Sequence, residues 1–144
     1  MDAATLRTAI PAAIDALGGD SRVSALGPDA WAIFRGTALG YVALIVPDGD
    51  DEPDSIVHVT FPILRVPDQG AEPLFRRLLE LNHELGSFAS FSLDNRGKVW
   101  LGAGRFAADL HEHGLRELIA QVAGLADRYD DELLEQFGKD LALK

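Results

Sequence analysis

The stretch VWLGAGRFAADLHEHGL, residues 99–115, decides which of two folds the chain adopts. Gly102, Gly104 and Ala107 form the pattern G-x-G-x-x-A between an expected strand and an expected helix, which is where a dinucleotide-binding fingerprint lies. Such a fingerprint also requires a parallel strand before the glycines and another parallel strand after the helix. Here the preceding strand is the second arm of a hairpin, and only the residues KDLALK follow the last helix. The stretch therefore favours an antiparallel sheet without a nucleotide site.

The two glycines also fit the alternation of the strand itself. Trp100, Gly102, Gly104 and Phe106 fall on one face, because successive side chains of a strand point to opposite sides of the sheet. Two neighbouring glycines on one face carry no side-chain bulk, and Trp100 and Phe106 flank them. We interpret the pair as a shallow groove that a helix or another chain approaches closely.

Residues 87–93, SFASFSL, and residues 98–106, KVWLGAGRF, have the composition of two strands. The residues DNRG join them and include Gly97, which can take the positive φ that a short hairpin loop needs. We expect the two segments to form an antiparallel hairpin.

Three further strands are expected upstream, in WAIFRG (31–36), TALGYVALIV (37–46) and SIVHVTFPILRV (55–66). Each is rich in β-branched and aromatic residues, which favour strands. In the third, Val57, Val59, Phe61 and Ile63 mark the more buried face. Pro62 cannot donate a ladder hydrogen bond, so we expect it at an edge or a bulge.

Apolar side chains recur at helical spacing in two segments before residue 90. Residues 5–17 form the first expected helix, with a kink or a restart at Pro11 because an interior proline removes a hydrogen bond. Residues 73–85 form the second, which begins at Pro73 and ends before Gly86. Phe75 and Leu79 widen its apolar face, so the helix has the means to contact a second surface.

Residues 109–137 predict a long amphipathic helix, which Gly114 or the pair Asp130 and Asp131 could interrupt. Asp109 is the expected cap, with Glu112 as its reciprocal partner. The order of elements is then α-β-β-β-α-β-β-α. This order predicts an α+β fold in which helices pack on an antiparallel sheet of about five strands, as one domain over residues 1–144.

Composition excludes several classes of function. The chain has 144 residues and no cysteine, which excludes thiol chemistry and disulfides and fits a cytoplasmic location. Its net charge is -10, so we expect neither nucleic acid nor an anionic membrane as a partner. The first residues show neither a signal peptide nor a membrane span.

No motif in the sequence predicts catalysis, a cofactor or a metal. His111 and His113 are two residues apart on an expected helix and cannot share one ion from one face. His58 and His83 are interpreted as surface or interface residues. The acidic run PDGDDEPD, residues 47–54, lacks the glycine and the glutamate of an EF-hand loop, so we interpret it as a solvated hairpin loop rather than a weak cation site. No nucleophile elbow or P-loop is present, and we expect no enzyme.

The segment from residue 74 to residue 138 resembles the YbjN family of bacterial proteins, which shares its fold with type III secretion chaperones of the CesT class. The resemblance rests on LLELN (78–82), GSF (86–88), DNRGKVWL (94–101) and the late spacing of Ala126, Asp127, Tyr129, Leu133, Phe137 and Gly138. It implies an α+β, type III secretion chaperone-like fold and no catalytic motif. The chaperone members are small acidic homodimers that hold an extended segment of a secreted protein, and YbjN members are described as regulators of sensory transduction.

The first functional hypothesis is therefore a non-enzymatic protein-binding module, chaperone-like or regulatory, that acts as a homodimer and binds a segment of a partner protein. The expected partner or dimer contacts are Phe75, Leu79, Trp100, Gly102, Gly104 and Phe106. The alternative is a small-molecule-sensing regulatory domain of a bacterial signalling pathway. A third possibility, an enzyme with a site assembled from distant residues, requires a deep polar cleft with convergent titratable groups.

Overall fold

A computed structural model describes residues 1–36, 38–47 and 54–143 of the protein. Its centre is an antiparallel sheet of six strands in the order β1-β2-β3-β4-β6-β5. The strands are β1 (Ser21–Gly27), β2 (Ala30–Arg35), β3 (Ala38–Ile45), β4 (Ile56–Arg65), β5 (Ser90–Leu93) and β6 (Lys98–Phe106). The fold is α+β, as the sequence predicts.

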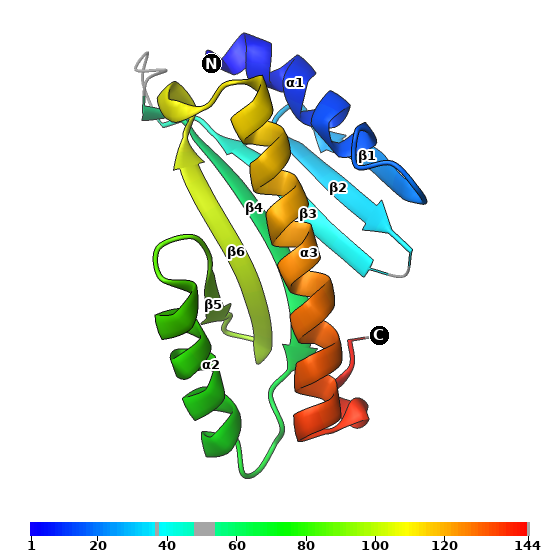
Figure 1. Ribbon diagram of the computed structural model, residues 1–144, viewed down its shortest axis with the longest axis vertical. Coiled ribbons are helices and arrows are strands. Elements are labelled where there is room, and N and C mark those ends of the chain that lie inside the picture. Colours follow the sequence, from blue (N-terminus) through cyan, green and yellow to red (C-terminus); the bar gives the residue numbers. More distant parts are fainter. Residues whose placement is uncertain (37, 48–53, 144) are drawn as a thin grey trace.

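Three helices pack on this sheet: α1 (Ala3–Asp15), α2 (Glu72–Leu85) and α3 (Glu112–Phe137). In Figure 1, α1 and α3 lie over the same face of the sheet, and α2 lies beside β5. Two short 3-10 helices, η2 (Ala107–Asp109) and η3 (Lys139–Leu141), flank α3. Within the part of the chain that the structure describes, no helix combines the length and the apolarity needed to cross a membrane.

The prediction of about five strands missed β1. This strand, SRVSALG, has mostly exposed residues along its length and pairs with β2 alone at one edge of the sheet. An edge strand of small and polar residues carries little of the apolar alternation that identifies strands in a sequence. The observed order is therefore α-β-β-β-β-α-β-β-α.

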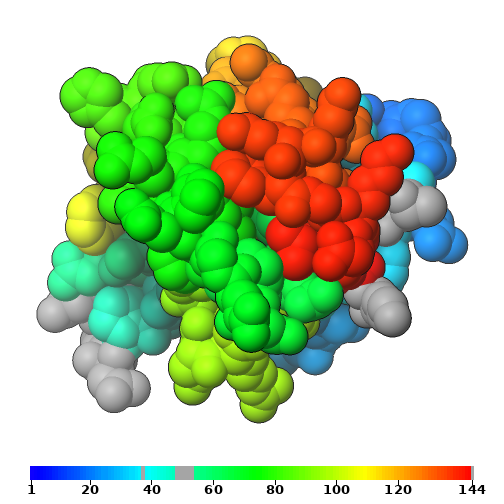
Figure 2. All heavy atoms as spheres, turned by 90° about the horizontal axis from the view of Figure 1, so that it is seen from below, coloured from blue at the N-terminus to red at the C-terminus, as the bar shows by residue number. Residues whose placement is uncertain are grey.

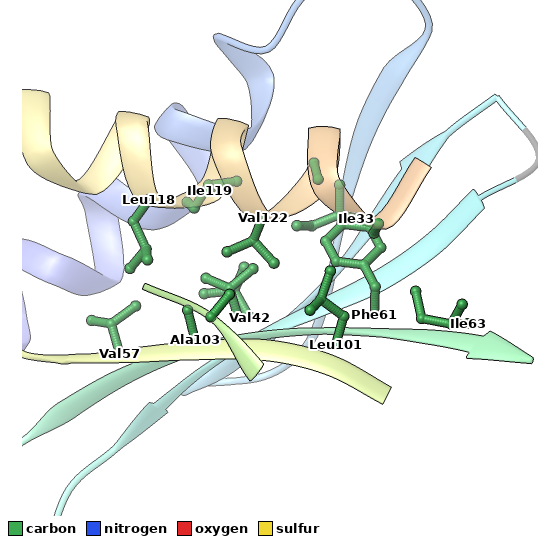
Figure 3. Close-up of a cluster of buried hydrophobic side chains, with 14 of the residues drawn as sticks. Ile33, Val42, Val57, Phe61, Ile63, Leu101, Ala103, Leu118, Ile119 and Val122 are labelled. Atoms are coloured by element: carbon green, nitrogen blue, oxygen red, sulfur yellow. The ribbon is translucent and has the colours of Figure 1, made fainter. Parts of the chain in front are cut away.

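The core lies between the sheet and α3. Figure 3 shows Val57, Phe61 and Leu101 pointing from the sheet toward Leu118 and Val122 of α3, and all five side chains are buried. Phe61 and Leu101 are direct partners in the pairing of β4 with β6. The alternation predicted for β4 is confirmed, because Val57, Val59, Phe61 and Ile63 are all buried.

Both long helices are continuous where the sequence suggested breaks. The α1 helix runs through Pro11 without restarting, and α3 runs through Gly114 and the two aspartates at 130 and 131. The predicted cap of α3 is wrong, because Asp109 lies in η2 and His111 occupies the N-cap without a side-chain hydrogen bond. Burial of the apolar faces of α1 and α3 against the sheet outweighs these local signals.

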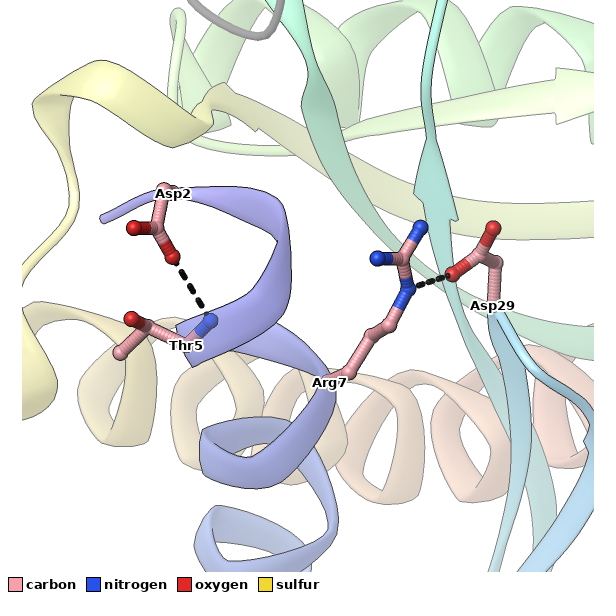
Figure 4. Close-up of polar contacts among 4 residues, drawn as sticks. All are labelled: Asp2, Thr5, Arg7 and Asp29. Carbon is pink, nitrogen blue, oxygen red and sulfur yellow. Dashed lines mark hydrogen bonds and ion pairs between the residues drawn. The ribbon is translucent and has the colours of Figure 1, made fainter.

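Polar contacts fix the start of α1 and its position on the sheet (Figure 4). The Asp2 carboxylate caps α1 by accepting a hydrogen bond of 2.7 Å from the Thr5 backbone N–H. The Arg7 guanidinium Nε donates to Asp29 Oδ1 at 2.7 Å, in the turn between β1 and β2. The cap is local to the helix, whereas the contact of Arg7 with Asp29 joins the N-terminal helix to the strand pair at one edge of the sheet.

The expectation for Pro62 is confirmed. The pairing of β4 with β6 shifts register between Pro62 and Leu64, which marks a bulge. The predicted turn after β5 also has the expected backbone, with Gly97 at φ 79. Most of the predicted acidic loop, residues 48–53, lies outside the described residues.

Substitution of two glycines by alanine is expected to have opposite effects on stability. A Cβ at Gly40 of β3 would collide with the ring of Phe61, whereas a Cβ at Gly124 of α3 would have no atom within 4 Å. Gly40→Ala should lower the free energy of unfolding by about 1–3 kcal/mol through overpacking. Gly124→Ala should raise it by about 0.5–1 kcal/mol, because glycine costs a helix backbone entropy. Urea denaturation of both variants measures the difference, and equal effects would contradict the packing at Gly40.

Truncation of core side chains should also destabilise the protein. Leu78 of α2 and Val122 of α3 are buried, so Leu78→Ala and Val122→Ala should each lower the free energy of unfolding by about 1–4 kcal/mol, the leucine by more. The exposed Arg116 of α3 provides a control, since Arg116→Ala should change it by less than about 0.5 kcal/mol. Unchanged melting of both core variants would mean that the helix faces are assigned wrongly.

Candidate functional site

The candidate site is the face of the sheet opposite α1 and α3, which we call the open face. In the described part of the chain, no helix lies over this face. Its side chains come from alternate positions of the four central strands β2, β3, β4 and β6. They include Phe34, Tyr41, Ala43, Ile45, Ile56, His58, Thr60, Pro62, Trp100, Gly102, Gly104 and Phe106.

Strand pairing arranges these side chains in rows across β3, β4 and β6. One end of the open face carries the apolar row Ile45, Ile56 and Phe106. Ile45 and Phe106 are 48% and 53% exposed, although isoleucine and phenylalanine are usually buried. This end of the sheet therefore presents apolar surface to solvent.

The other end of the open face carries two aromatic rings. Trp100 of β6 and Tyr41 of β3 are both half-buried. Their ring centroids lie 6.1 Å apart with the planes tilted by 45°, a separation typical of interacting aromatic pairs. Trp100, a residue predicted from the sequence, thus has a neighbour that the sequence analysis did not single out.

A carboxylate in the β5–β6 turn holds the indole of Trp100. Trp100 Nε1 donates to Asp94 Oδ2 at 2.9 Å, while Asp94 Oδ1 accepts from the backbone N–H groups of Arg96 and Lys98 at 2.8 Å and 2.9 Å. The hydrogen bond from Trp100, followed by those from the turn, lowers the pKa of Asp94. Asp94 is therefore ionised at neutral pH, and both of its oxygens are available as acceptors.

Between the two apolar ends lies a row with small side chains, Ala43 and Gly104, and the imidazole of His58. A Cβ at Gly102 would lie 3.0 Å from Thr60 Cγ2 and 3.4 Å from His58 Nε2. A Cβ at Gly104 would lie 3.5 Å from His58 Cδ2. Side chains of β4 thus lean over Gly102 and partly fill the space above the two glycines.

The remaining predicted contacts, Phe75 and Leu79, lie on the outer face of α2. They are 37% and 69% exposed, whereas Leu74, Leu78 and Leu81 on the inner face are buried. A shallow surface hollow follows this outer face and is lined by Glu72, Phe75, Arg76, Leu79, Glu80, His83 and Glu84. The structure therefore places the six predicted residues on two separate surfaces, four on the open face and two on α2.

Figure 2 shows the end of the molecule at which α2 and the β5–β6 turn lie. The green α2 lies next to the orange-to-red end of α3, and the yellow-green turn between β5 and β6 projects on the side away from the helices. A surface hollow between the two helices is lined by Pro73, Arg76, Arg77, Glu80, Gln136 and Phe137.

A helix side chain occupies the β5 edge of the sheet. The Asn82 amide of α2 accepts a hydrogen bond from the Phe91 N–H at 2.6 Å and donates one to the Phe91 carbonyl at 3.2 Å. These are the backbone groups with which a further strand would pair. Asn82 therefore closes the edge of β5 at Phe91, and this role gives no recognisable signal in the sequence.

The charges of the molecule are separated between its layers. None of the six described strands contains Asp or Glu, so the 23 acidic residues of the chain all lie outside them. Charged residues in the strands are all basic: Arg22, Arg35, Arg65, Lys98 and Arg105. The strand residues of the open face thus include no carboxylate, in a protein whose net charge is -10.

Titratable side chains do not gather around a metal position in the described residues, where no group of three or more His, Asp or Glu could hold an ion. His58 lies on the open face, and His83 lies on the outer face of α2. His111 precedes the first residue of α3, Glu112. The surface positions predicted for the first two are therefore confirmed.

Comparisons with known proteins identify the fold and the family of the chain. No curated protein shows a significant match to this sequence. Similar chains occur in solved structures, and the three described below are all under 25% identical to this chain, so that the likeness concerns the fold.

The first is the crystal structure of the ExsC–ExsE complex, with a TM-score of 0.66, 20% identity, and coverage of 91% of this chain and 96% of the other. The HopA1–SchA chaperone–effector complex gives 0.59, 12%, and coverage of 91% and 98%. The heterodimeric ExoU–SpcU complex from the type III secretion system of Pseudomonas aeruginosa gives 0.56, 14%, and coverage of 85% and 95%.

A family model matches residues 5–143, which is nearly the whole chain. The sequence resemblance to YbjN proteins and CesT-class chaperones is thereby confirmed and extended upstream of residue 74. The chain belongs to the family described as T3SS (YopN, CesT) and YbjN peptide-binding chaperone 1.

Proposed function

We propose that the protein is a non-enzymatic, chaperone-like module whose open face binds a segment of another protein. The observation that carries this proposal is an apolar sheet face with aromatic side chains that no described helix covers. Large apolar side chains that gather on one exposed face often mark an interaction site. The family description, which names peptide binding, supports the same role.

The side chains of the open face provide aromatic and aliphatic contacts for a bound segment. Trp100 and Tyr41 provide large rigid contacts at one end, and Ile45, Ile56 and Phe106 provide apolar contacts at the other. Tryptophan and tyrosine are enriched among residues that dominate binding energy. The absence of carboxylates from the six described strands favours an apolar segment over a basic one. We therefore expect the bound segment to carry aromatic or aliphatic side chains.

The solved structures with a similar fold support a protein partner. One is a chaperone–effector complex, and the other two are complexes of two different proteins. We propose that residues 1–144 act as one domain of this kind in the cytoplasm. If the protein acts as a chaperone, its partner is an effector, and if it acts as a regulator, its partner is a signalling protein. The open face is the binding surface in both cases.

We further propose that the protein is a homodimer that associates through the outer face of α2. Phe75 and Leu79 supply apolar area, and Glu72, Arg76, Glu80 and His83 surround them with both signs of charge. A two-fold axis brings the same surface of two copies together. In an antiparallel pairing of helices, each Arg76 can face Glu80 of the other copy, so the surface complements itself.

Loss of Trp100 should abolish most of the peptide affinity. The probe is the strongest binder from a phage-displayed random peptide library selected on the wild-type protein, synthesised and titrated by calorimetry. Trp100→Ser should weaken binding about 30-fold or more, as expected for a residue worth about 2 kcal/mol or more. The control is Leu93→Ser, because Leu93 is 46% exposed but lies on the other face of the sheet.

Equal losses in the two variants, or full affinity in Trp100→Ser, would contradict binding at the open face.

Native mass spectrometry of gently purified protein tests the alternative, a small-molecule sensor. A retained ligand of fixed mass would favour the sensor, and an apo mass would favour the peptide-binding module.

A charge at Leu79 should dissociate the homodimer. Sedimentation velocity over a concentration series should give a dimer for the wild type and a monomer for Leu79→Glu, because a buried unpaired carboxylate is costly at an interface. Leu26→Glu is the matched control, since Leu26 is 59% exposed on β1 and lies outside the α2 surface. A wild type that stays monomeric at the highest concentration would end the dimer proposal.

A further inference from the structure

The contacts of Asp94 connect a turn to the open face. It follows the last residue of β5 and accepts three hydrogen bonds, two from the turn backbone and one from the indole of Trp100. Its own N–H donates to the Lys98 carbonyl at 3.0 Å, which closes the turn. The carboxylate thus links the hairpin backbone to the orientation of one aromatic ring.

The indole of Trp100 is restrained from two sides. Its Nε1 is fixed to Asp94, and its ring packs against Tyr41, which lies two strands away. Gly102, the next residue of β6 on the same face, adds no side chain beside it. An exposed tryptophan without such contacts can adopt several rotamers, whereas the hydrogen bond and the ring contact here both favour the same orientation of the indole.

We propose that Asp94 is a positioning residue that holds Trp100 in its peptide-binding orientation before the partner arrives. This inference rests on the proposed function, because the bound segment is the one that contacts Trp100. A side chain that must be ordered on binding costs about 0.5–1.5 kcal/mol of affinity. The hydrogen bond to Asp94 removes this cost in advance, because the ring is already ordered in the free protein.

The two oxygens of Asp94 have separate partners, which makes the inference testable. Oδ1 accepts both backbone N–H groups of the turn, and Oδ2 accepts only the indole N–H. In Asp94→Asn, the amide oxygen can keep both turn hydrogen bonds, and the NH₂ group then faces the indole N–H, to which it cannot bind. The opposite amide orientation would lose two hydrogen bonds to restore one. Asp94→Asn therefore breaks the contact with Trp100 and preserves the turn.

The experiment compares Asp94→Asn with the wild type by two readouts. The first is the ¹H–¹⁵N signal of the Trp100 indole, assigned by its absence from Trp100→Phe. It should move upfield and exchange faster with solvent. The second is the affinity for the library-selected peptide defined above, which should fall about 2- to 12-fold, the equivalent of the ordering cost. The thermal midpoint should change little, because the turn is preserved.

Two controls separate positioning from general effects. Asp109→Asn removes the same charge at an exposed position of η2 and should leave the indole signal and the affinity unchanged. In a Trp100→Phe background, Asp94→Asn should no longer change the affinity, since the indole N–H through which Asp94 acts is absent.

An unmoved indole signal together with unchanged affinity would overturn the inference. So would an affinity loss of the same size in the Trp100→Phe background or in Asp109→Asn, because Asp94 would then act through the turn or through net charge. If the library yields no peptide that binds the wild type, the proposed function fails instead. The indole signal then decides by itself whether Asp94 fixes the ring.

Discussion

The packing of α3 against β4 and β6 is the interaction on which the rest of the structure depends. Buried side chains from one face of the two central strands, such as Phe61 and Leu101, meet the apolar face of α3. Because side chains of a strand alternate between faces, committing one face to the core fixes which side chains point away from it. The composition of the open face is therefore set by the same register that builds the core.

Two sets of side-chain contacts restrict the exposed parts of this sheet, one at its β5 edge and one on its open face. At the β5 edge, the Asn82 amide takes both backbone groups of Phe91, so this position cannot pair with another strand. On the open face, cross-strand contacts restrain the aromatic side chains, and Trp100 is held between Asp94 and Tyr41. A binding surface made of restrained side chains loses less entropy on association than a mobile one. The chain belongs to a family of peptide-binding chaperones, and the open face is the surface that we propose for this binding.

Much of the fold was predicted from local sequence patterns, and the predictions that were wrong have physical reasons. The alternation in β4 and the turn at Gly97 are as predicted, because both depend on residues close in sequence. The first strand, β1, was missed since an edge strand needs few apolar residues. Of the two alternatives expected at Pro11, a kink or a restart, the restart is not seen, and the cap at Asp109 was wrong, because tertiary burial stabilises α1 and α3 beyond their local preferences.

By itself, the sequence determined the antiparallel hairpin, the face on which Trp100, Gly102, Gly104 and Phe106 lie, and the exposed apolar stripe of α2. Only the tertiary structure decided which side chains surround them. Tyr41 meets Trp100 because β4 separates their strands in the sheet, and Asn82 meets Phe91 because α2 packs beside β5. The physical reason is that a period of two or of 3.6 residues reports the direction of a side chain relative to its own element. Its neighbours depend on strand order and helix placement, which arise from contacts between residues far apart in the chain.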